Sequence, residues 1–429
     1  MQNSIKPPQP FEKNLLHYGR DFQPELIARA EGSYLYTEGG REILDFSSGQ
    51  MCATIGHNHP KITEAMAKAG ETVLHLDSTM VTRDVVDLVE QLCDLLPDPL
   101  NKAQLLNTGG EANEAAIRLA KIATGKFEII GMAGSWHGTT TGAASATYAH
   151  GRKGYGPAVP GSLAIPAPNC FRCPLRKTID SCDMDCLDLG FEMIDATSVG
   201  QEAALIVEPI QSAGGIIVPP NGYFKRLREK CDQRGIILIF DESQTGLGRT
   251  GKLFGFESEG VVPDILTLSK TLGGGLPLSA VIASEKVAAA AKENGFSHYT
   301  SHASDPLMAT VGLAVVGVIL DEDLAARAES VGRYLKDRLC ELQSRHNAIG
   351  DVRGHGLLLG VEIVADRKTR EPGHDLIKAL TKRCYDLGLN INQVGGPHSV
   401  WRIAPPLTIS EKEIDHAVKV MDMALAQIP

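Results

Sequence analysis

Residues 236–242 have the sequence Ile-Ile-Leu-Ile-Phe-Asp-Glu, in which five apolar residues are followed by two carboxylates. A short, continuous apolar run that stops at a polar residue is typical of a strand buried inside a parallel sheet. Open sheets of this kind bind ligands outside the carboxyl ends of their strands. We therefore expect Asp241 to lie at the ligand-binding edge of an α/β fold.

The glycine-rich stretch after this strand resembles the phosphate loop of an NTPase. Residues 246–252 read Gly-Leu-Gly-Arg-Thr-Gly-Lys, but Leu253 stands where that motif requires the Ser or Thr that binds magnesium. The glycines also follow the acidic strand directly, whereas a phosphate loop joins an earlier strand to a helix. The sequence therefore disfavours an NTPase.

Helix-like and strand-like patterns alternate over residues 61–310. Amphipathic spacing predicts helices at Lys61–His75, Val85–Leu96 and Glu111–Thr124. Short apolar runs predict strands at Glu128–Met132, Ala204–Val207, Ile236–Phe240 and Ala280–Ala283. This alternation predicts the α/β class, with helices covering a mostly parallel sheet.

The pattern changes after residue 310 and predicts a smaller α+β unit. Its expected elements are helices at Met308–Leu320 and Leu324–Ser344 and strands at Gly356–Ile363 and Val400–Ala404. The strand-like segments Ser33–Thr37 and Glu42–Phe46 are expected to join it. We place the boundaries as residues 1–60 for the N-terminal part of the small domain, 61–310 for the large domain and 311–429 for the C-terminal part.

The composition excludes several functional classes. The chain has 42 Lys and Arg residues against 52 Asp and Glu residues, a net charge of −10, and no basic cluster of the kind that grips nucleic acid. Its N-terminus lacks the layout of a secretory signal. The longest nearly apolar run, Leu307 to Leu320, is shorter than the roughly 18–20 residues needed to cross a bilayer. We expect a cytoplasmic protein.

Nine cysteines are too few for a disulfide scaffold in a chain of 429 residues. Four of them, Cys170, Cys173, Cys182 and Cys186, are spaced so that their thiolates could surround one tetrahedral ion. This spacing is compatible with two interpretations, a structural zinc site and a set of reduced, unligated thiols.

Lys270 is the candidate for covalent chemistry. It follows the apolar stretch Asp264–Leu268 and precedes the three glycines 273–275. A solvated strand end would give the same pattern, but the glycines leave the amine uncovered, and a partly desolvated lysine has a lowered pKa. Only its free amine forms an imine with an aldehyde. Asp241 and Lys270 together predict pyridoxal phosphate, with the carboxylate holding the pyridine nitrogen protonated.

Two further segments suit this cofactor. Residues 107–114, Asn-Thr-Gly-Gly-Glu-Ala-Asn-Glu, run from an apolar stretch into a helix whose first amides can bind phosphate, with a further bond from Thr108. In Ser135-Trp-His-Gly138 the indole of Trp136 could stack on the ring, although a core position explains Trp136 equally well.

Taken together, these segments resemble the class III aminotransferases, which have the fold-type I pyridoxal-phosphate fold. The resemblance extends from Leu44-Asp-Phe-Ser-Ser-Gly to Arg402-Ile-Ala-Pro-Pro-Leu. It implies Lys270 as the Schiff-base lysine, Asp241 as the pyridinium partner and Trp136 as the stacking residue. It further implies cofactor contacts from Thr108, Gly109, Gly110, Asn113, His137, Glu208, Gln244 and Ser301. Ser301 would reach the phosphate of a neighbouring subunit, which implies a homodimer or a dimer of dimers.

Within that family the sequence is most similar to the 2,2-dialkylglycine decarboxylases. Ser48-Gly-Gln-Met51 matches their motif, in which the glutamine, here Gln50, contacts the carboxylate that leaves. Arg402 would bind the carboxylate that stays during transamination. The bond that breaks must stand perpendicular to the ring plane, so these two contacts select between decarboxylation and proton removal. A turn residue that satisfies backbone groups is the alternative interpretation of Gln50.

The resemblance also implies an alkali-metal ion, K⁺ or Na⁺, near the active site. The matching ligands are Leu76, Ser78, Ser301, Ala303 and Asp305, which offer the oxygen atoms that such ions prefer. Asp77 replaces an apolar residue beside this site. Glu208 would lie near the substrate and pair with Arg402.

The leading functional prediction is therefore a two-step enzyme. A 2,2-dialkylglycine such as 2-aminoisobutyrate would lose CO2 and give a ketone, and a 2-oxo acid such as pyruvate would then be aminated. The alternative is an ω-amino-acid or amine:2-oxo acid aminotransferase without decarboxylation. A catalytically inactive homologue would lack Lys270, Asp241 or the phosphate segment, and none of these is missing.

Overall fold

The computed structural model describes residues 13–16, 19, 21–149, 154–178 and 181–427. Its centre is a seven-stranded sheet in the order β4-β10-β9-β8-β7-β5-β6. The strands are β4 (Leu100–Leu106), β5 (Glu128–Met132), β6 (Ser162–Ile165), β7 (Glu202–Val207), β8 (Ile237–Asp241), β9 (Ile265–Leu268) and β10 (Ser279–Ser284). All neighbours are parallel except β10, which is antiparallel to both β4 and β9. The predicted mostly parallel α/β fold is confirmed.

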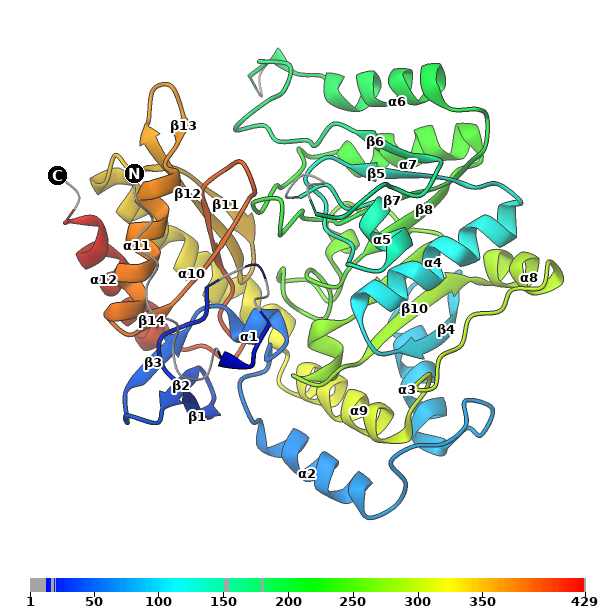
Figure 1. Cartoon of the computed structure of the whole chain (residues 1–429), viewed down its shortest axis with the longest axis horizontal. Helices are drawn as coiled ribbons and strands as arrows, with labels where there is room; N and C mark the ends of the chain where they lie inside the picture. Colours follow the sequence, from blue (N-terminus) through cyan, green and yellow to red (C-terminus); the bar gives the residue numbers. More distant parts are fainter. Residues whose placement is uncertain (1–12, 17–18, 20, 150–153, 179–180, 428–429) are drawn as a thin grey trace.

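Helices cover both faces of this sheet (Figure 1). They are α2 (Pro60–Gly70), α3 (Arg83–Asp94), α4 (Gly109–Thr124), α5 (Thr141–Ser145), α6 (Asp185–Thr197), α7 (Tyr223–Arg234), α8 (Glu285–Glu293) and α9 (Pro306–Asp321). Successive strand residues point to opposite faces, so Ile206 packs with α4 and α8 while Leu205 and Val207 pack with the other helices. Both faces are apolar because both are buried.

The two ends of the chain form a second group of elements. Strands β1 (Ile27–Glu31), β2 (Tyr34–Thr37) and β3 (Glu42–Asp45) continue into β14 (Leu389–Asn390), which is parallel to β3. A further sheet contains β11 (Ile349–His355), β12 (Leu358–Asp366), β16 (Val400–Ile403) and β15 (Asn392–Val394), and β13 (Glu371–Pro372) pairs with β12. Helices α10 (Leu324–Arg345), α11 (His374–Asp386) and α12 (Glu411–Leu425) complete the group. Figure 1 shows these blue and yellow-to-red elements side by side.

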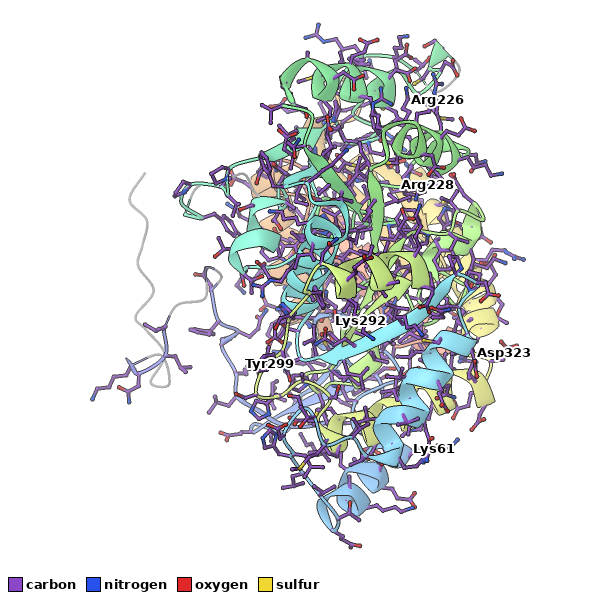
Figure 2. The ribbon with its side chains drawn as sticks, turned by 90° about the vertical axis from the view of Figure 1, so that its right-hand side faces the viewer. Lys61, Arg226, Arg228, Lys292, Tyr299 and Asp323 are labelled. Carbon is purple, nitrogen blue, oxygen red and sulfur yellow. The ribbon has the colours of Figure 1, made fainter. Side chains whose placement is uncertain are left out.

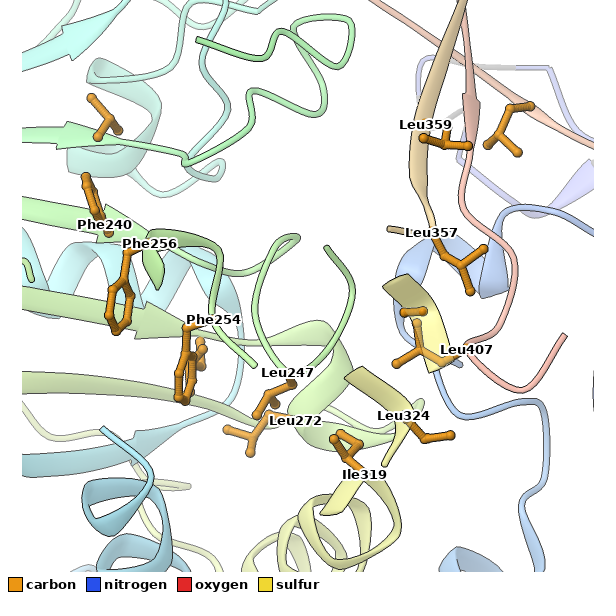
Figure 3. Close-up of a cluster of buried hydrophobic side chains, with 14 of the residues drawn as sticks. Phe240, Leu247, Phe254, Phe256, Leu272, Ile319, Leu324, Leu357, Leu359 and Leu407 are labelled. Carbon is orange, nitrogen blue, oxygen red and sulfur yellow. The ribbon is translucent and has the colours of Figure 1, made fainter. Parts of the chain in front are cut away.

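One apolar cluster joins the two groups of elements. It includes Phe240, Phe254 and Leu272 beside the central sheet and Leu357 and Leu407 beside the second group, as Figure 3 shows. The guanidinium of the fully buried Arg249 crosses the same junction and donates hydrogen bonds to the carbonyls of Leu357, at 3.1 Å, and Pro405, at 2.5 Å. Apolar packing and a buried cation therefore fix how the central sheet meets the terminal elements.

The helix predicted at residues 61–75 is shorter in the structure. It is α2, which begins at Pro60, in the first-turn position where proline is tolerated, and ends at Gly70. The segment from Glu71 to Thr82 is not helical, and it contains several of the predicted ion ligands. Among the described residues no helix is long and apolar enough to span a membrane.

Two helix glycines provide a test of the packing between α10 and the turn joining β11 to β12. A Cβ on Gly332 of α10 would lie 2.2 Å from the carbonyl oxygen of Gly356, whereas a Cβ on Gly317 of α9 would meet nothing within 4 Å. Gly332→Ala should therefore destabilise the protein by roughly 1–3 kcal/mol or more through overpacking. Gly317→Ala should stabilise it by about 0.5–1 kcal/mol because alanine favours helix.

The measurement is the urea midpoint of each variant against the unmodified chain. Similar midpoints for the two variants would contradict the packing described at Gly332.

Candidate active site

A cavity of about 440 Å³ opens at the carboxyl edge of the central sheet. Strands β4, β5, β8 and β9 all end there, because β4 lies across the antiparallel β10 and so has the direction of β9. The cavity is lined by Asn107, Thr108, Gly109, Gly110 and Asn113 after β4, Trp136, His137 and Gly138 after β5, Asp241 and Ser243 at the end of β8, and Ser269 and Lys270 after β9. The structure thus brings most of the predicted cofactor residues together.

Asp241 ends β8 and is only 3% exposed. Its Oδ2 lies 2.9 Å from His137 Nδ1 and 2.8 Å from Asn113 Nδ2, and its Oδ1 accepts a hydrogen bond from the Ser243 amide at 3.0 Å. Burial alone would raise the pKa of this carboxyl, but its hydrogen bonds, first the one with His137, outweigh burial and lower the pKa. Asp241 is therefore held as an anion.

Asn113 fixes this arrangement from a second direction. Its Nδ2 also donates to the carbonyl of His137 at 2.7 Å, and its Oδ1 accepts from Thr267 Oγ1 at 2.7 Å. Thr267 lies on β9 directly opposite Asp241 in the strand register. The polar groups at the sheet edge thus hold one another in place through direct hydrogen bonds.

Lys270 follows β9 by two residues and begins the short helix η4 (Lys270–Gly273). Its φ of +44° lies in the left-handed region that side-chain-bearing residues rarely adopt, and such strain is typical of functional positions. Burial lowers the pKa of its ammonium group, and the attraction of Asp241 offsets this in part. A lowered pKa increases the share of free amine, the form that attacks an aldehyde.

The start of α4 combines a helix cap with an anion-binding position. Thr108 Oγ1 accepts from the Glu111 amide at 3.3 Å, and Glu111 Oε2 accepts from the amides of Asn107 and Thr108, each at 3.0 Å. The Thr108 hydroxyl therefore serves as the helix N-cap. First-turn amides of a helix have no partner within it, so those of Gly109 and Gly110 are available to an anion.

The wall beside these glycines carries unsatisfied hydroxyls. A Cβ on Gly109 would lie 2.8 Å from Ser269 Oγ and 3.1 Å from Ser243 Oγ. Both hydroxyls are buried and have no hydrogen-bond partner among the residues that the structure describes. Gly138, at φ +132°, approaches so closely that its Cβ would lie 2.6 Å from Gly110 Cα. Buried hydroxyls without partners require explanation, and a bound phosphate would satisfy them.

The cavity therefore fits pyridoxal phosphate. Lys270 suits its aldehyde, the anion of Asp241 suits a protonated ring nitrogen, and the start of α4 suits its phosphate. Trp136 lies in the cavity wall and is partly exposed, with its ring 6.4 Å from that of Tyr155, so the core interpretation of Trp136 is wrong. When bound, the cofactor would supply an electron-accepting ring.

Arg402 and Glu208 do not form the pair that the sequence predicted. Nη1 of the buried Arg402 donates to Gln244 Oε1 at 3.0 Å. Glu208 instead accepts from the amides of Trp136, at 2.9 Å, and Ser212, at 3.2 Å. Burial raises the pKa of Glu208 to about 7. A carboxyl held by two backbone amides does not need a guanidinium, which explains why the predicted pairing is replaced.

Gln50 and Ser301 lie outside the cavity lining. The side chains of both residues are exposed to solvent in the single chain. Gln50 belongs to the short element α1 (Ser48–Met51), whose four residues all have positive φ, from 47° to 67°. Cys52, immediately after α1, does line the cavity.

The predicted ion ligands lie on two segments that contact each other, residues 76–78 and residues 301–305. Ser78 Oγ donates to the Thr300 carbonyl at 3.2 Å, which links the segments that contain Leu76 and Ser301. Ala303 is buried. Each carboxylate oxygen of Asp305 lies 2.6 Å from an imidazole nitrogen, Oδ1 from that of His75 and Oδ2 from that of His302. The oxygen-only alkali site stays a prediction.

The four cysteines Cys170, Cys173, Cys182 and Cys186 do not form a compact ligand group. Among the described residues the one set of three or more ligand atoms within 4.8 Å is that of His75, His302 and Asp305. The four are free thiols, and burial raises the pKa of Cys186 to about 11. The four thiols lie near enough for their charges to interact, but no three of them lie within 4.8 Å of one another, so the structural zinc site stays a prediction.

Sequence reasoning gave no role to several residues of the site, among them four polar ones: Cys52, Ser243, Thr267 and Ser269. Three of them had a usable signal. Ser243 adjoins the Asp241 strand end, and Thr267 and Ser269 flank the last residue of the strand before Lys270. Cys52 directly follows the predicted Ser48-Gly-Gln-Met51 motif, but its own residue type gave no signal.

Comparisons with known proteins agree with this geometry. The aminotransferase class-III family model matches residues 18–425. An uncharacterized aminotransferase of Schizosaccharomyces pombe is 48% identical, covering 99% of this chain and 96% of the relative. A leucine/methionine racemase of Thermococcus litoralis is 36% identical, covering 95% and 92%.

Among solved structures, an (S)-enantioselective ω-transaminase from Thermomicrobium roseum superposes with a TM-score of 0.89 at 31% identity, covering 96% of each chain. The match of the family model over nearly the whole chain and these relatives show that the chain belongs to the class III aminotransferase family.

Proposed function

We propose that this protein is a pyridoxal-phosphate-dependent aminotransferase that moves an amino group from an amine or ω-amino acid to a 2-oxo acid such as pyruvate. The observation that carries this proposal is the buried Arg402 beside Gln244. An arginine fork binds a carboxylate through two parallel hydrogen bonds, and every 2-oxo acid presents one. The ω-transaminase and aminotransferase names among the similar proteins support the same reaction class.

The chain's own residues would divide the work as follows. Asp241 holds a proton on the ring nitrogen, and Arg402 orients the substrate carboxylate. Lys270 would move a proton at the substrate carbon, first as base and then as acid. Trp136 covers the ring, and Gln244 would offer its amide N–H groups to the ring hydroxyl.

Decarboxylation of 2,2-dialkylglycines is the second candidate. The four successive positive φ values of α1 favour it, because strained backbone marks functional segments and Gln50 belongs to this one. Against it, the Gln50 side chain is exposed, whereas decarboxylation needs a contact that holds the leaving carboxylate perpendicular to the ring.

An assay of amino donors with pyruvate separates the two candidates. Amines and ω-amino acids should give alanine without CO2, and 2-aminoisobutyrate should give no acetone above a Lys270→Ala control. Release of one CO2 for each alanine formed would show that the decarboxylase is the correct function. A parallel incubation of leucine without any 2-oxo acid tests racemisation, the activity named for one relative.

Arg402 and Gln50 provide a matched pair of substitutions. Arg402→Leu should raise KM for pyruvate roughly 10- to 100-fold, since it removes a charged hydrogen-bond donor, while KM for an amine without a carboxylate stays unchanged. Gln50→Ala should leave both values within about twofold. Initial rates over a range of each substrate give these constants, and a larger loss in Gln50→Ala would contradict the proposal.

The lowered pKa of Lys270 predicts how cofactor loading depends on pH. Uptake of pyridoxal phosphate by the apo chain should accelerate as pH rises and level off below 10.5, the ordinary lysine value, because the free amine forms earlier. In Asp241→Asn the profile should move to lower pH, since Asp241 raises the pKa of Lys270.

The rise in violet-edge absorbance after rapid mixing measures the rate of uptake. A profile that keeps rising to pH 10.5, as for free lysine, would exclude a desolvated amine.

We also infer a homodimer whose subunits share active sites. Ser301 lies on the segment between α8 and α9, where Tyr299 is 79% exposed (Figure 2). A large exposed aromatic side chain beside a residue expected to reach a neighbouring phosphate favours a subunit contact. The cytoplasmic location stays a prediction.

A further inference from the structure

His75, Asp305 and His302 form a cluster outside the active-site cavity. His75 Nδ1 lies 2.6 Å from Asp305 Oδ1, and His302 Nδ1 lies 2.6 Å from Asp305 Oδ2. The two imidazole rings have centroids 4.9 Å apart and planes tilted by 50°. One carboxylate is therefore flanked by two imidazoles that come from different parts of the chain.

The cluster joins two segments that are far apart in sequence. His75 lies in the irregular stretch after α2, whereas His302 and Asp305 immediately precede α9. A hydrogen bond from Ser78 to the Thr300 carbonyl ties the same segments together a few residues away. The positions of the three side chains are thus set by the fold.

The ligand chemistry of this cluster suits a transition metal. Its ligand atoms lie within 4.8 Å of one another. Imidazole nitrogen with one carboxylate is a preferred set for Zn²⁺, Co²⁺ and Ni²⁺, whereas alkali ions take oxygen ligands. The side chain of Asp305 is 11% exposed and those of His75 and His302 are 50% and 61% exposed in the single chain, so the carboxylate forms the base of the cluster and the imidazoles lie at the surface of the chain.

We propose that His75, His302 and Asp305 bind a divalent transition-metal ion such as Zn²⁺, with the remaining position taken by water. Ligand atoms of tetrahedral zinc at about 2.0–2.1 Å are separated by roughly 3.3 Å, so the two 2.6 Å nitrogen-to-oxygen distances must lengthen when the ion binds. Each Nδ1 that binds the ion gives up the hydrogen it shares with Asp305, and the neutral ring then carries its hydrogen on Nε2. Asp77, within electrostatic reach of His75, adds negative charge nearby.

The bound ion would link the segment after α2, which contains His75, to the segment just before α9, which contains His302 and Asp305. Ser301 adjoins His302, so this link would fix the segment expected to reach a neighbouring subunit. That consequence depends on the proposed function, whereas the binding of metal does not.

Cobalt binding to the holoenzyme tests the proposal directly. After treatment with a chelator and dialysis, the protein is titrated with Co²⁺ and with Zn²⁺, followed by visible absorption and calorimetry. We expect one ion for each chain, with weak visible bands of nitrogen and oxygen ligation. His75→Gln and His302→Gln should each weaken binding at least about tenfold.

His346→Gln is the matched control. His346 forms a 2.6 Å bond with Asp422 but has no second imidazole, so its loss should leave metal affinity unchanged. Melting temperature and circular dichroism check that all three variants fold.

Three results would overturn the proposal: no saturable binding at micromolar Co²⁺, equal affinity in the His75 and His302 variants, or intense near-ultraviolet sulfur-to-cobalt bands as the sole signal. The last would place the ion on cysteines.

Discussion

The site depends on keeping one carboxylate ionised inside the protein. Asp241 is 3% exposed, and an unpaired anion at that depth would take up a proton. Hydrogen bonds with His137, Asn113 and the Ser243 amide prevent this. The resulting anion is what a protonated ring nitrogen requires, and the cavity's other features are arranged around it.

The parallel arrangement of β8 and β9 explains why Asp241 and Lys270 share one cavity. Adjacent parallel strands end at the same edge, and the register sets Asp241 opposite Thr267, three residues before Lys270. Thr267 also bonds Asn113, so the strand that positions the lysine supports the network around the carboxylate. Adjacent strand ends thus supply the two groups that the chemistry needs.

Most of the cofactor site could be predicted from the sequence, because short local patterns mark strand ends and helix starts, and the fold brings these to one edge of the sheet. The apolar run ending at Asp241, the lysine before three glycines and the Thr-Gly-Gly helix start each identify a strand end or helix start, and strand ends converge at one edge. The partners of Arg402 and Glu208 could not be predicted, because a neighbouring amide or backbone N–H leaves no periodic signal in the sequence. The end of α2 at Gly70 had a local signal in the glycine itself, whereas the contact of His75 with Asp305 joins segments far apart in sequence and leaves no local signal.

The central claim is that the buried, ionised Asp241 keeps a proton on the cofactor ring. Nuclear magnetic resonance of the holoenzyme, loaded with pyridoxal phosphate whose ring nitrogen is isotopically labelled, reports that proton directly. The account predicts the chemical shift of a protonated ring nitrogen at neutral and mildly alkaline pH, and an unprotonated shift in Asp241→Ala. An unprotonated nitrogen in the unmodified enzyme at neutral pH would contradict it.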